Sequence, residues 1–502
     1  MHRILDCYLH LIGLRPSVQP SIQKIGLRCP LSVNLSLNLI SPPAPGARFS
    51  QFALALLLLA ASLAGKVSGA ETSDQQKLPK LDPRLQQFFA AKERHARSLA
   101  RELKLEVAPE IWDFFDAGVK GNWSSVRELW HELSDRSGQY SRGTMDESVR
   151  TVVWSPVLEA ELAYECFTAM DIQFVEMFAR GTIDSIPRDS IYFGGTDPGR
   201  GVITAFCKSH ADADPFFVLT QNALADGLYL KYLQATFGKR IFVPSEDDSK
   251  NAFEQYKSDA EDRMDRGKLK PGEQVSRKGG RLQFSGQVSV MAINGLLAKT
   301  IFEGNPTREF YIEESFPLDW MYPHLSPHGL IMKINRQPLA QISDAVLQKD
   351  REYWRKQTAR FLGDWITEET PLKTLCQFIE RVYLDDDLEG FKGDPLYVTA
   401  DRAYSPRRLY SKLRQAHAGV YAWRLERAGT STEKEAMKRA AELAFKQTLT
   451  LCPEGSENVR LFAAFLREQN RLADARLVLE TGLKFNPRSR RLRELADELK
   501  AN

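Results

Sequence analysis

Cysteine is scarce and scattered in this chain. Six cysteines occur in 502 residues, and no two of them form a CxxC pair. Such pairs are typical of zinc ribbons and of thioredoxin-like redox sites, so nothing here indicates either class. Four cysteines lie beyond residue 70: Cys166, Cys207, Cys376 and Cys452. Structural disulfides and buried free thiols are both compatible with this spacing.

Long apolar runs are also missing, apart from one near the N-terminus. Residues 52–64 are apolar, but they cover about two thirds of the roughly 20 residues that a membrane-spanning helix needs. Basic residues precede this run, and Ser68-Gly69-Ala70 places small residues where signal peptidase cuts. We therefore interpret residues 1–70 as a leader with a signal peptide, and an uncleaved membrane anchor is the alternative. The protein is then expected to be periplasmic or extracellular, with at most a peripheral or N-terminal association with the membrane.

An excess of basic charge is missing beyond the leader. Residues 1–70 carry six Lys or Arg and one Asp, and their removal changes the formal net charge from +3 to −2. A nucleic-acid-binding domain shows a net basic face or stripe. The composition therefore argues against nucleic acid as a partner, while 43% apolar residues predict an ordinary globular core.

Two short apolar runs are the most informative feature that is present. Ile191-Tyr192-Phe193 leads into the glycine-rich loop 194–201, and residues 216–219 lead into the polar loop 220–227. A segment that reads as helical separates them, and the order strand, loop, helix, strand, loop predicts a parallel α/β sheet. Ligands of open α/β sheets bind outside the carboxyl ends of the strands, so we expect any site at this edge.

The predicted fold class is α/β: an open, mainly parallel sheet domain flanked by an N-terminal helical hairpin and a C-terminal tetratricopeptide-like repeat region. The expected units are a leader at 1–70 with its apolar run at 52–64, an N-terminal helical region at 83–154, the α/β domain at 155–338, a helical connector at 339–400 and the repeats at 405–502. Within the α/β domain we expect a β-hairpin around 278–281, a helix opened by Ser245, and further strands at 240–244, 309–314 and 329–335.

The end of the chain shows a repeat. Pro453 and Pro487 lie 34 residues apart, which is the period of tetratricopeptide repeats. With each proline at the closing position of a repeat, Ala441 and Ala475 fall at the small-residue position and Ala463 at the close-packing one. This spacing predicts two stacked helical pairs that bind a protein partner. A hairpin at 109–134 has the outline of a further unit or is an ordinary pair of helices.

Eight residues in the two polar loops are candidate ligand contacts. Glycines let the backbone approach a ligand, and the helix after the first loop presents free N–H groups. An arginine in that loop suits a carboxylate or a phosphate, while amides and carboxylates in the second loop suit sugar hydroxyls. The alternative is tight turns with a capping aspartate and internal hydrogen bonds. The candidates are Gly194, Gly195, Thr196, Asp197, Arg200, Gln221, Asn222 and Asp226.

No pattern predicts a catalytic nucleophile, a cofactor or a metal. The glycine-rich loop is neither GxGxxG nor a P-loop, and no GxSxG occurs. Glu313 ends a further strand, and His324 and His328 follow it, but the flanking prolines keep these histidines off one helical face. Residues 385–390 begin like a calcium loop, yet Leu396 stands where the required Glu would be. We therefore expect no catalytic nucleophile, no cofactor and no metal, and we favour a protein that is not an enzyme.

Three segments resemble a bacterial group of membrane proteins: 191–200, 220–226 and 323–331. They are similar to the extracytoplasmic C-terminal domain of planctomycete and verrucomicrobial proteins of unknown function that look like GT-C glycosyltransferases. Members often end in tetratricopeptide repeats. The resemblance implies an exported, free-standing accessory domain beside envelope glycosylation. In such transferases a multi-spanning membrane domain holds the catalytic acid and the polyprenyl-linked donor, and no such domain is seen here, so no catalytic residue is carried over.

The sequence thus predicts an exported, non-catalytic binding or scaffold protein of the cell envelope. Its α/β domain would bind a polar ligand or glycan, and its repeats a protein partner. The alternative is a glycan-modifying enzyme or an accessory subunit of envelope glycosyl transfer. In that case Asp197 or Asp226 would act as general acid or base, and Arg200 would hold an anionic group.

Overall fold

The structure, a computed structural model, describes residues 82–139, 145–195, 197–207, 215–270, 272–279, 281–313, 320–400 and 406–501. These residues form a mostly helical protein with a mixed five-stranded sheet and a separate two-stranded hairpin. The predicted leader lies outside the described residues. No helix in the described part of the chain is both long and apolar enough to cross a membrane.

The sheet has the strand order β2-β1-β5-β7-β6. Strand β1 pairs in parallel with β2 and β5, whereas β7 pairs antiparallel with β5 and β6. The mixture of helices and strands agrees with the predicted α/β class. The sheet is nevertheless mixed instead of mainly parallel, because its second half returns as a hairpin. The strands are β1 (Ile191–Gly194), β2 (Phe217–Thr220), β5 (Phe310–Ile312), β6 (Leu325–His328) and β7 (Ile331–Ile334).

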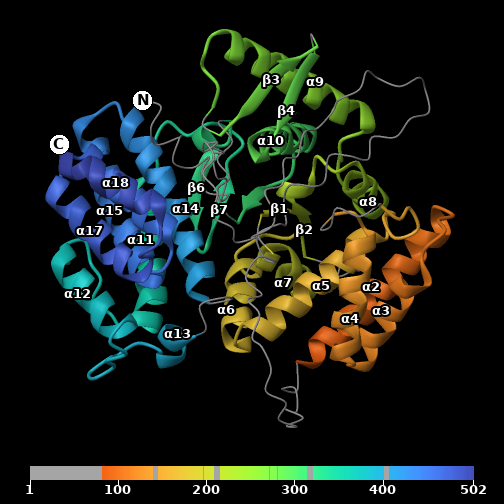
Figure 1. Cartoon of the computed structure of the whole chain (residues 1–502), viewed down its shortest axis with the longest axis horizontal. Helices are drawn as coiled ribbons and strands as arrows, with labels where there is room; N and C mark the ends of the chain where they lie inside the picture. The colour runs from red at the N-terminus through yellow and green to blue at the C-terminus, as the bar shows by residue number, and fades with distance from the viewer. Residues whose placement is uncertain are drawn as a thin grey trace, which may run out of the picture.

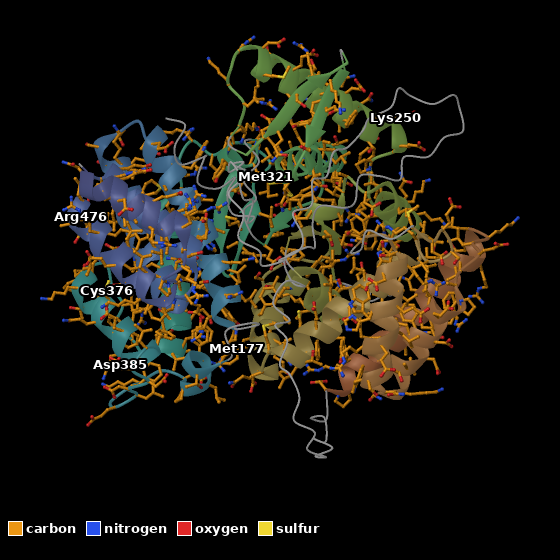
Figure 2. All side chains as sticks on the ribbon, in the orientation of Figure 1. Met177, Lys250, Met321, Cys376, Asp385 and Arg476 are labelled. Atoms are coloured by element: carbon orange, nitrogen blue, oxygen red, sulfur yellow. The ribbon has the colours of Figure 1, made fainter. Side chains whose placement is uncertain are left out.

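Helices surround the sheet on both sides of the molecule. In Figure 1 the strands lie near the centre, between the orange N-terminal helices and the blue C-terminal ones. Figure 2 shows the side chains that fill this space: Met321 lies centrally and is buried, whereas Lys250 projects from the outer edge. Helix α7 (Asp197–Phe206) packs against β2. The other helices of this part of the chain include α5 (Trp154–Ala169), α6 (Ile172–Ile183), α8 (Gly227–Phe237) and α10 (Gln287–Gly304).

The described part of the N-terminal region begins with the helices α2 (Pro83–Glu102), α3 (Pro109–Lys120) and α4 (Trp123–Arg136). The turn between α3 and α4 is built as the sequence predicts. Gly121 adopts a left-handed φ of 72°, which suits glycine at a helix end, and the Asn122 side chain caps α4. Helix α2 packs against both α3 and α5, so it links this hairpin to α5.

The strand predicted at 240–244 is wrong, and a single side chain explains why. Asn305 Oδ1 accepts a hydrogen bond from the Phe242 N–H at 2.8 Å, and Asn305 Nδ2 donates to the Phe242 carbonyl at 3.0 Å. The asparagine amide therefore makes the two bonds that a neighbouring strand would have made. The segment forms no strand and joins no sheet.

The predicted elements on either side of a long helix are confirmed. Ser245 and Asp248 form a capping box at the start of α9 (Glu246–Asp265). The expected hairpin consists of β3 (Gln274–Lys278) and β4 (Arg281–Ser285), which pair antiparallel. This hairpin is a sheet of its own and adds no strand to the central one.

The connector and the C-terminal region are helical. Helix α14 packs closely on α15, and α16 on α17. Ala441, Ala463 and Ala475 are fully buried, as their predicted positions require. Membership of the tetratricopeptide class stays a prediction. The helices are α11 (Asp344–Leu362), α12 (Leu372–Tyr383), α13 (Pro395–Thr399), α14 (Pro406–Arg427), α15 (Ser431–Leu451), α16 (Ser456–Glu468), α17 (Leu472–Phe485) and α18 (Arg490–Ala501).

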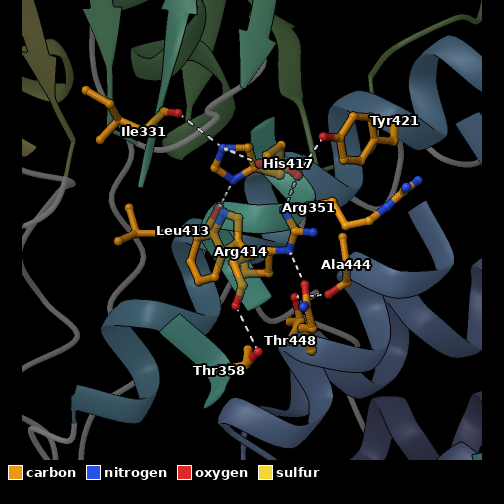
Figure 3. Close-up of polar contacts among 12 residues, drawn as sticks. Ile331, Arg351, Thr358, Leu413, Arg414, His417, Tyr421, Ala444 and Thr448 are labelled. Carbon is orange, nitrogen blue, oxygen red and sulfur yellow. Dashed lines mark hydrogen bonds and ion pairs between the residues drawn. The ribbon is translucent and has the colours of Figure 1, made fainter. Parts of the chain in front are cut away.

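A buried polar network joins these helices to one another (Figure 3). Arg414 donates from Nη1 to Asp350 at 2.7 Å and from Nε to the Gln447 side-chain oxygen at 2.7 Å. The Tyr421 hydroxyl donates to the same Asp350 oxygen at 2.7 Å. Burial and the Asp350 carboxylate raise the pKa of Tyr421 well above its ordinary value, so this hydroxyl keeps its proton.

One histidine ties α14 to the sheet. His417 is fully buried, and its ring nitrogens lie 2.9 Å from the Leu413 carbonyl and 3.1 Å from the Ile331 carbonyl in β7. Burial lowers the pKa of His417, which favours the neutral ring, and a neutral ring donates to one of the two carbonyls. The sheet and the C-terminal helices therefore meet through buried polar contacts as well as apolar ones.

Candidate functional site

The carboxyl ends of the three parallel strands meet at one edge of the sheet. Gly194 of β1 lies opposite Thr220 of β2, and Phe193 lies opposite Ile312 of β5. The next residue along each strand is therefore Gly195, Gln221 or Glu313. This is the edge at which the sequence predicts a ligand site.

Both backbone polar groups of Gly195 are hydrogen-bonded to side chains. Its N–H donates to Glu313 Oε2 at 2.9 Å, and its carbonyl accepts from Asn222 Nδ2 at 2.6 Å. Asn294 of α10 supports this arrangement, since its Nδ2 donates to the Asn222 carbonyl at 2.9 Å and its Oδ1 accepts from the Ala225 N–H at 2.7 Å. Gly195 and Asn222, both candidates from the sequence, are thus brought together. Glu313 and Asn294, which contact them, are not among the candidates.

Glu313 and Asn294 were missed for different reasons. Glu313 was noticed as the end of a strand, but only the sheet order places that strand beside β1. Asn294 is an isolated polar residue in the apolar helix α10 and is fully buried there. A buried asparagine in an apolar helix needs hydrogen-bond partners, and this is the signal that could have singled it out.

The glycines of the loop are explained by close packing. A Cβ at Gly199 would lie 1.8 Å from Glu313 Oε2, and a Cβ at Gly194 would lie 2.6 Å from the Gly199 carbonyl oxygen. Gly199 belongs to the first turn of α7, so the fully buried Glu313 carboxylate lies against the N-terminal end of that helix. Negative charge is favoured at a helix N-terminus. The position that an anionic ligand would take is therefore already filled by Glu313.

Two amide side chains at this edge have unused hydrogen-bonding groups. Gln221 is fully buried, and neither of its amide atoms has a hydrogen-bond partner among the described residues. Asn222 Oδ1 is likewise buried without such a partner. Leaving a buried polar group unpaired costs about 1–3 kcal/mol. If these groups stay unpaired, they lower the stability of the fold. If a ligand binds beside them, they form hydrogen bonds to it.

Arg200 lies in a buried cluster that reaches α5. Its Nη2 is 3.5 Å from Glu159 Oε1, and its guanidinium lies 5.0 Å from the centre of the Tyr229 ring. Glu159 also forms an ion pair with Lys92 and accepts from the Tyr232 hydroxyl at 3.0 Å. Burial and the Glu159 carboxylate raise the pKa of Tyr232 well above its ordinary value, so it remains a donor. Arg200 thus already faces a carboxylate of the protein.

Asp226 also has structural partners. Its Oδ1 accepts from the Leu228 N–H at 3.0 Å and caps α8, and its Oδ2 accepts from Arg150 at 2.6 Å. Thr196 and the side chain of Asp197 lie outside the described residues. Of the eight candidates, the structure therefore gathers Gly194, Gly195, Gln221 and Asn222 at the strand ends, and it gives Arg200 and Asp226 partners of their own.

His324, at the end of a short 3-10 helix, and His328, in β6, contact backbone carbonyls. His324 Nδ1 lies 2.6 Å from the Asn335 carbonyl, and His328 Nε2 lies 2.7 Å from the Ser185 carbonyl. Burial lowers the pKa of His328, so its ring is neutral and donates this bond. Among the described residues, no group of three or more His, Cys, Asp or Glu side chains could hold a metal ion.

Comparison with protein-family models, with curated proteins and with solved structures finds no match to this chain. The resemblance to the glycosyltransferase-like membrane proteins remains a prediction.

Proposed function

We propose that this protein is an exported, non-catalytic binding protein that holds a small polar ligand at the carboxyl ends of β1, β2 and β5. The observation that supports this is Gln221, a fully buried amide with no hydrogen-bond partner among the described residues. Folded proteins pair nearly all their buried polar groups. A ligand bearing both donors and acceptors would supply the bonds that the described residues do not.

A glycan-modifying enzyme is the weaker alternative. Hydrolysis of a glycosidic bond uses two carboxyl groups on opposite sides of the substrate. Asp226 has both oxygens engaged by Leu228 and Arg150, which leaves it poorly suited to proton transfer. Arg200, the residue expected to hold an anion, lies beside Glu159. Both observations favour binding over catalysis.

The C-terminal helical pairs are proposed to hold a protein partner. Helix α14 is buried over most of its length, by its neighbours α15 and α16 and by contacts to the sheet, so it offers little surface. The other end of the region is open: α18 is half-exposed along its described side chains. We therefore place the partner surface on α17 and α18. Export to the cell envelope is proposed from the leader pattern at residues 1–70.

A thermal-shift experiment tests ligand binding. The protein is heated with neutral sugars, amino sugars and sugar phosphates, and wild type is compared with Gln221→Met, which has a side chain of similar length without polar hydrogen-bonding groups. The matched control is Gln348→Met, because Gln348 is an exposed glutamine on α11. A ligand of this site should raise the Tm of wild type and of Gln348→Met but not of Gln221→Met. A shift that survives Gln221→Met would move the site elsewhere.

A further inference from the structure

The charge at the strand ends restricts what can bind there. The Glu313 carboxylate accepts from the Gly195 N–H and lies against Gly199 at the start of α7. A phosphate or carboxylate ligand at this edge would therefore face the Glu313 carboxylate, which already lies against the N-terminus of α7 and accepts a hydrogen bond from the Gly195 N–H. Like charges brought together in a buried site repel strongly.

The unused amide groups restrict the ligand further. Asn222 donates from Nδ2 to the Gly195 carbonyl, which can only accept, so this contact fixes which end of the amide is oxygen. Two acceptors, Asn222 Oδ1 and Gln221 Oε1, and one donor group, Gln221 Nε2, have no partner among the described residues. A phosphate offers only acceptors and leaves both oxygens unpaired. An ammonium offers only donors and leaves Gln221 Nε2 unpaired, whereas hydroxyl groups serve all three.

We infer that the ligand of this site is an uncharged, hydroxyl-rich molecule of the sugar class, and that Glu313 excludes its phosphorylated forms. This inference rests on the proposed function, because it concerns the same site. The Gly195 N–H and the N-terminus of α7 stabilise a negative charge on this carboxylate. Glu313 is thus a specificity-determining residue.

Matched ligands test the inference. Glucose, galactose and mannose are titrated by calorimetry into the full chain, each as the free sugar, the 2-amino sugar and the 6-phosphate. At least one free sugar should bind, and its 6-phosphate should bind at least about tenfold more weakly. The amino sugar should not bind more tightly than the free sugar.

Replacing the charge tests the cause. Glu313→Gln keeps an oxygen for the Gly195 N–H and removes the negative charge, so the preference for the free sugar over its phosphate should fall to less than about threefold. The matched control is Glu309→Gln at the other end of β5, where Glu309 pairs with Lys333 on the surface at 2.6 Å. It removes one charge from the residue that precedes β5 and should leave the preference unchanged.

The outcomes separate the two proposals. Tight binding of a 6-phosphate or an amino sugar that is lost in Gln221→Met would overturn the inference and leave the proposed function standing. An equal drop in preference for Glu313→Gln and Glu309→Gln would also overturn it. Binding of no ligand, or binding unaffected by Gln221→Met, would overturn the proposed function itself. If Glu313→Gln does not fold, the wild-type ratio of the two dissociation constants decides alone.

Discussion

Two buried glutamines illustrate two different uses of a polar side chain. Gln447, at the junction of the C-terminal helices, accepts a hydrogen bond from Arg414, which in turn is paired with Asp350. Gln221, at the strand ends, is equally buried but has no partner for either amide atom among the described residues. The junction therefore uses its polar groups to hold helices together, whereas the strand ends keep theirs available.

The largest expected effect is a loss of unfolding free energy when the buried ion pair between Arg414 of α14 and Asp350 of α11 is broken. Arg414→Leu leaves Asp350 buried without its cation, and breaking a buried ion pair costs about 3–5 kcal/mol. Urea unfolding followed by circular dichroism measures this loss. The control is Arg355→Leu, which breaks a half-exposed pair with Asp364 and should cost less than about 1 kcal/mol. Equal losses for the two variants would contradict a structural role for the junction.

The close approach at the strand ends should give the next largest effect. Gly199→Ala places a Cβ 1.8 Å from Glu313 Oε2, and the forced shift should cost about 1–3 kcal/mol of unfolding free energy. Gly429→Ala is the matched control, because a Cβ there meets nothing within 4 Å. It should leave stability unchanged or raise it slightly. A neutral Gly199→Ala would show that Glu313 does not lie against α7.

The two glutamines should respond to the same substitution with opposite signs. Gln447→Met leaves Arg414 Nε unpaired and should lower the unfolding free energy by about 1–3 kcal/mol. Gln221→Met removes two unpaired polar atoms and should raise it by about 1–2 kcal/mol when no ligand is present. Urea unfolding of both variants checks this contrast. Destabilisation by Gln221→Met would mean that its amide is bonded in solution.

The smallest effect concerns Glu161, a buried carboxyl group that keeps its proton in the folded protein. Burial, followed by the nearby Glu165 charge, raises the pKa of Glu161 well above its ordinary value. The folded protein thus holds a proton that the unfolded chain releases above about pH 4.5. The stability that Glu161 contributes is complete below that pH and is lost as pH rises through the folded pKa.

Glu161→Gln should remove this pH dependence. The variant should gain on wild type as pH rises above 4.5, with a slope of at most about 1.4 kcal/mol per pH unit. Urea unfolding at pH 4, 5, 6 and 7 measures the slope. Glu128→Gln on the exposed face of α4 is the control and should show a flat difference. A flat difference for Glu161→Gln as well would mean that Glu161 is ionised in the fold.

Local patterns predicted many elements because each depends on neighbouring residues alone. The Ser245 capping box, the hairpin at 274–285 and the β1–α7–β2 unit all form as expected. Strand β6, which contains Pro327, was not predicted. It forms at the edge of the sheet, where a proline without an N–H is tolerated. Strand 240–244 failed because Asn305 took the place of a partner strand.

Three residues of the candidate site could also be predicted from local patterns. Gly195, Gln221 and Asn222 follow two strands that are adjacent in sequence, so their closeness follows from one crossover unit. Glu313 lies more than 100 residues from Gly195 along the chain, and no local pattern connects them. Arg200 was expected at a ligand, but its position on α7 brings it to Glu159 of α5. Residues that are distant in the sequence therefore determine the contacts of both Glu313 and Arg200.

By itself the sequence determined the strand-loop-helix-strand unit, the helical pairs and the edge at which polar loops gather, because apolar spacing, caps and turn residues act over a few neighbours. Only the tertiary structure decided which charge occupies that edge and which amides stay unpaired. The order of strands brought Glu313 to Gly195, and the packing of α5 against α7 brought Arg200 beside Glu159. Electrostatics and hydrogen bonding depend on distances through space, and these arise only when distant segments pack together.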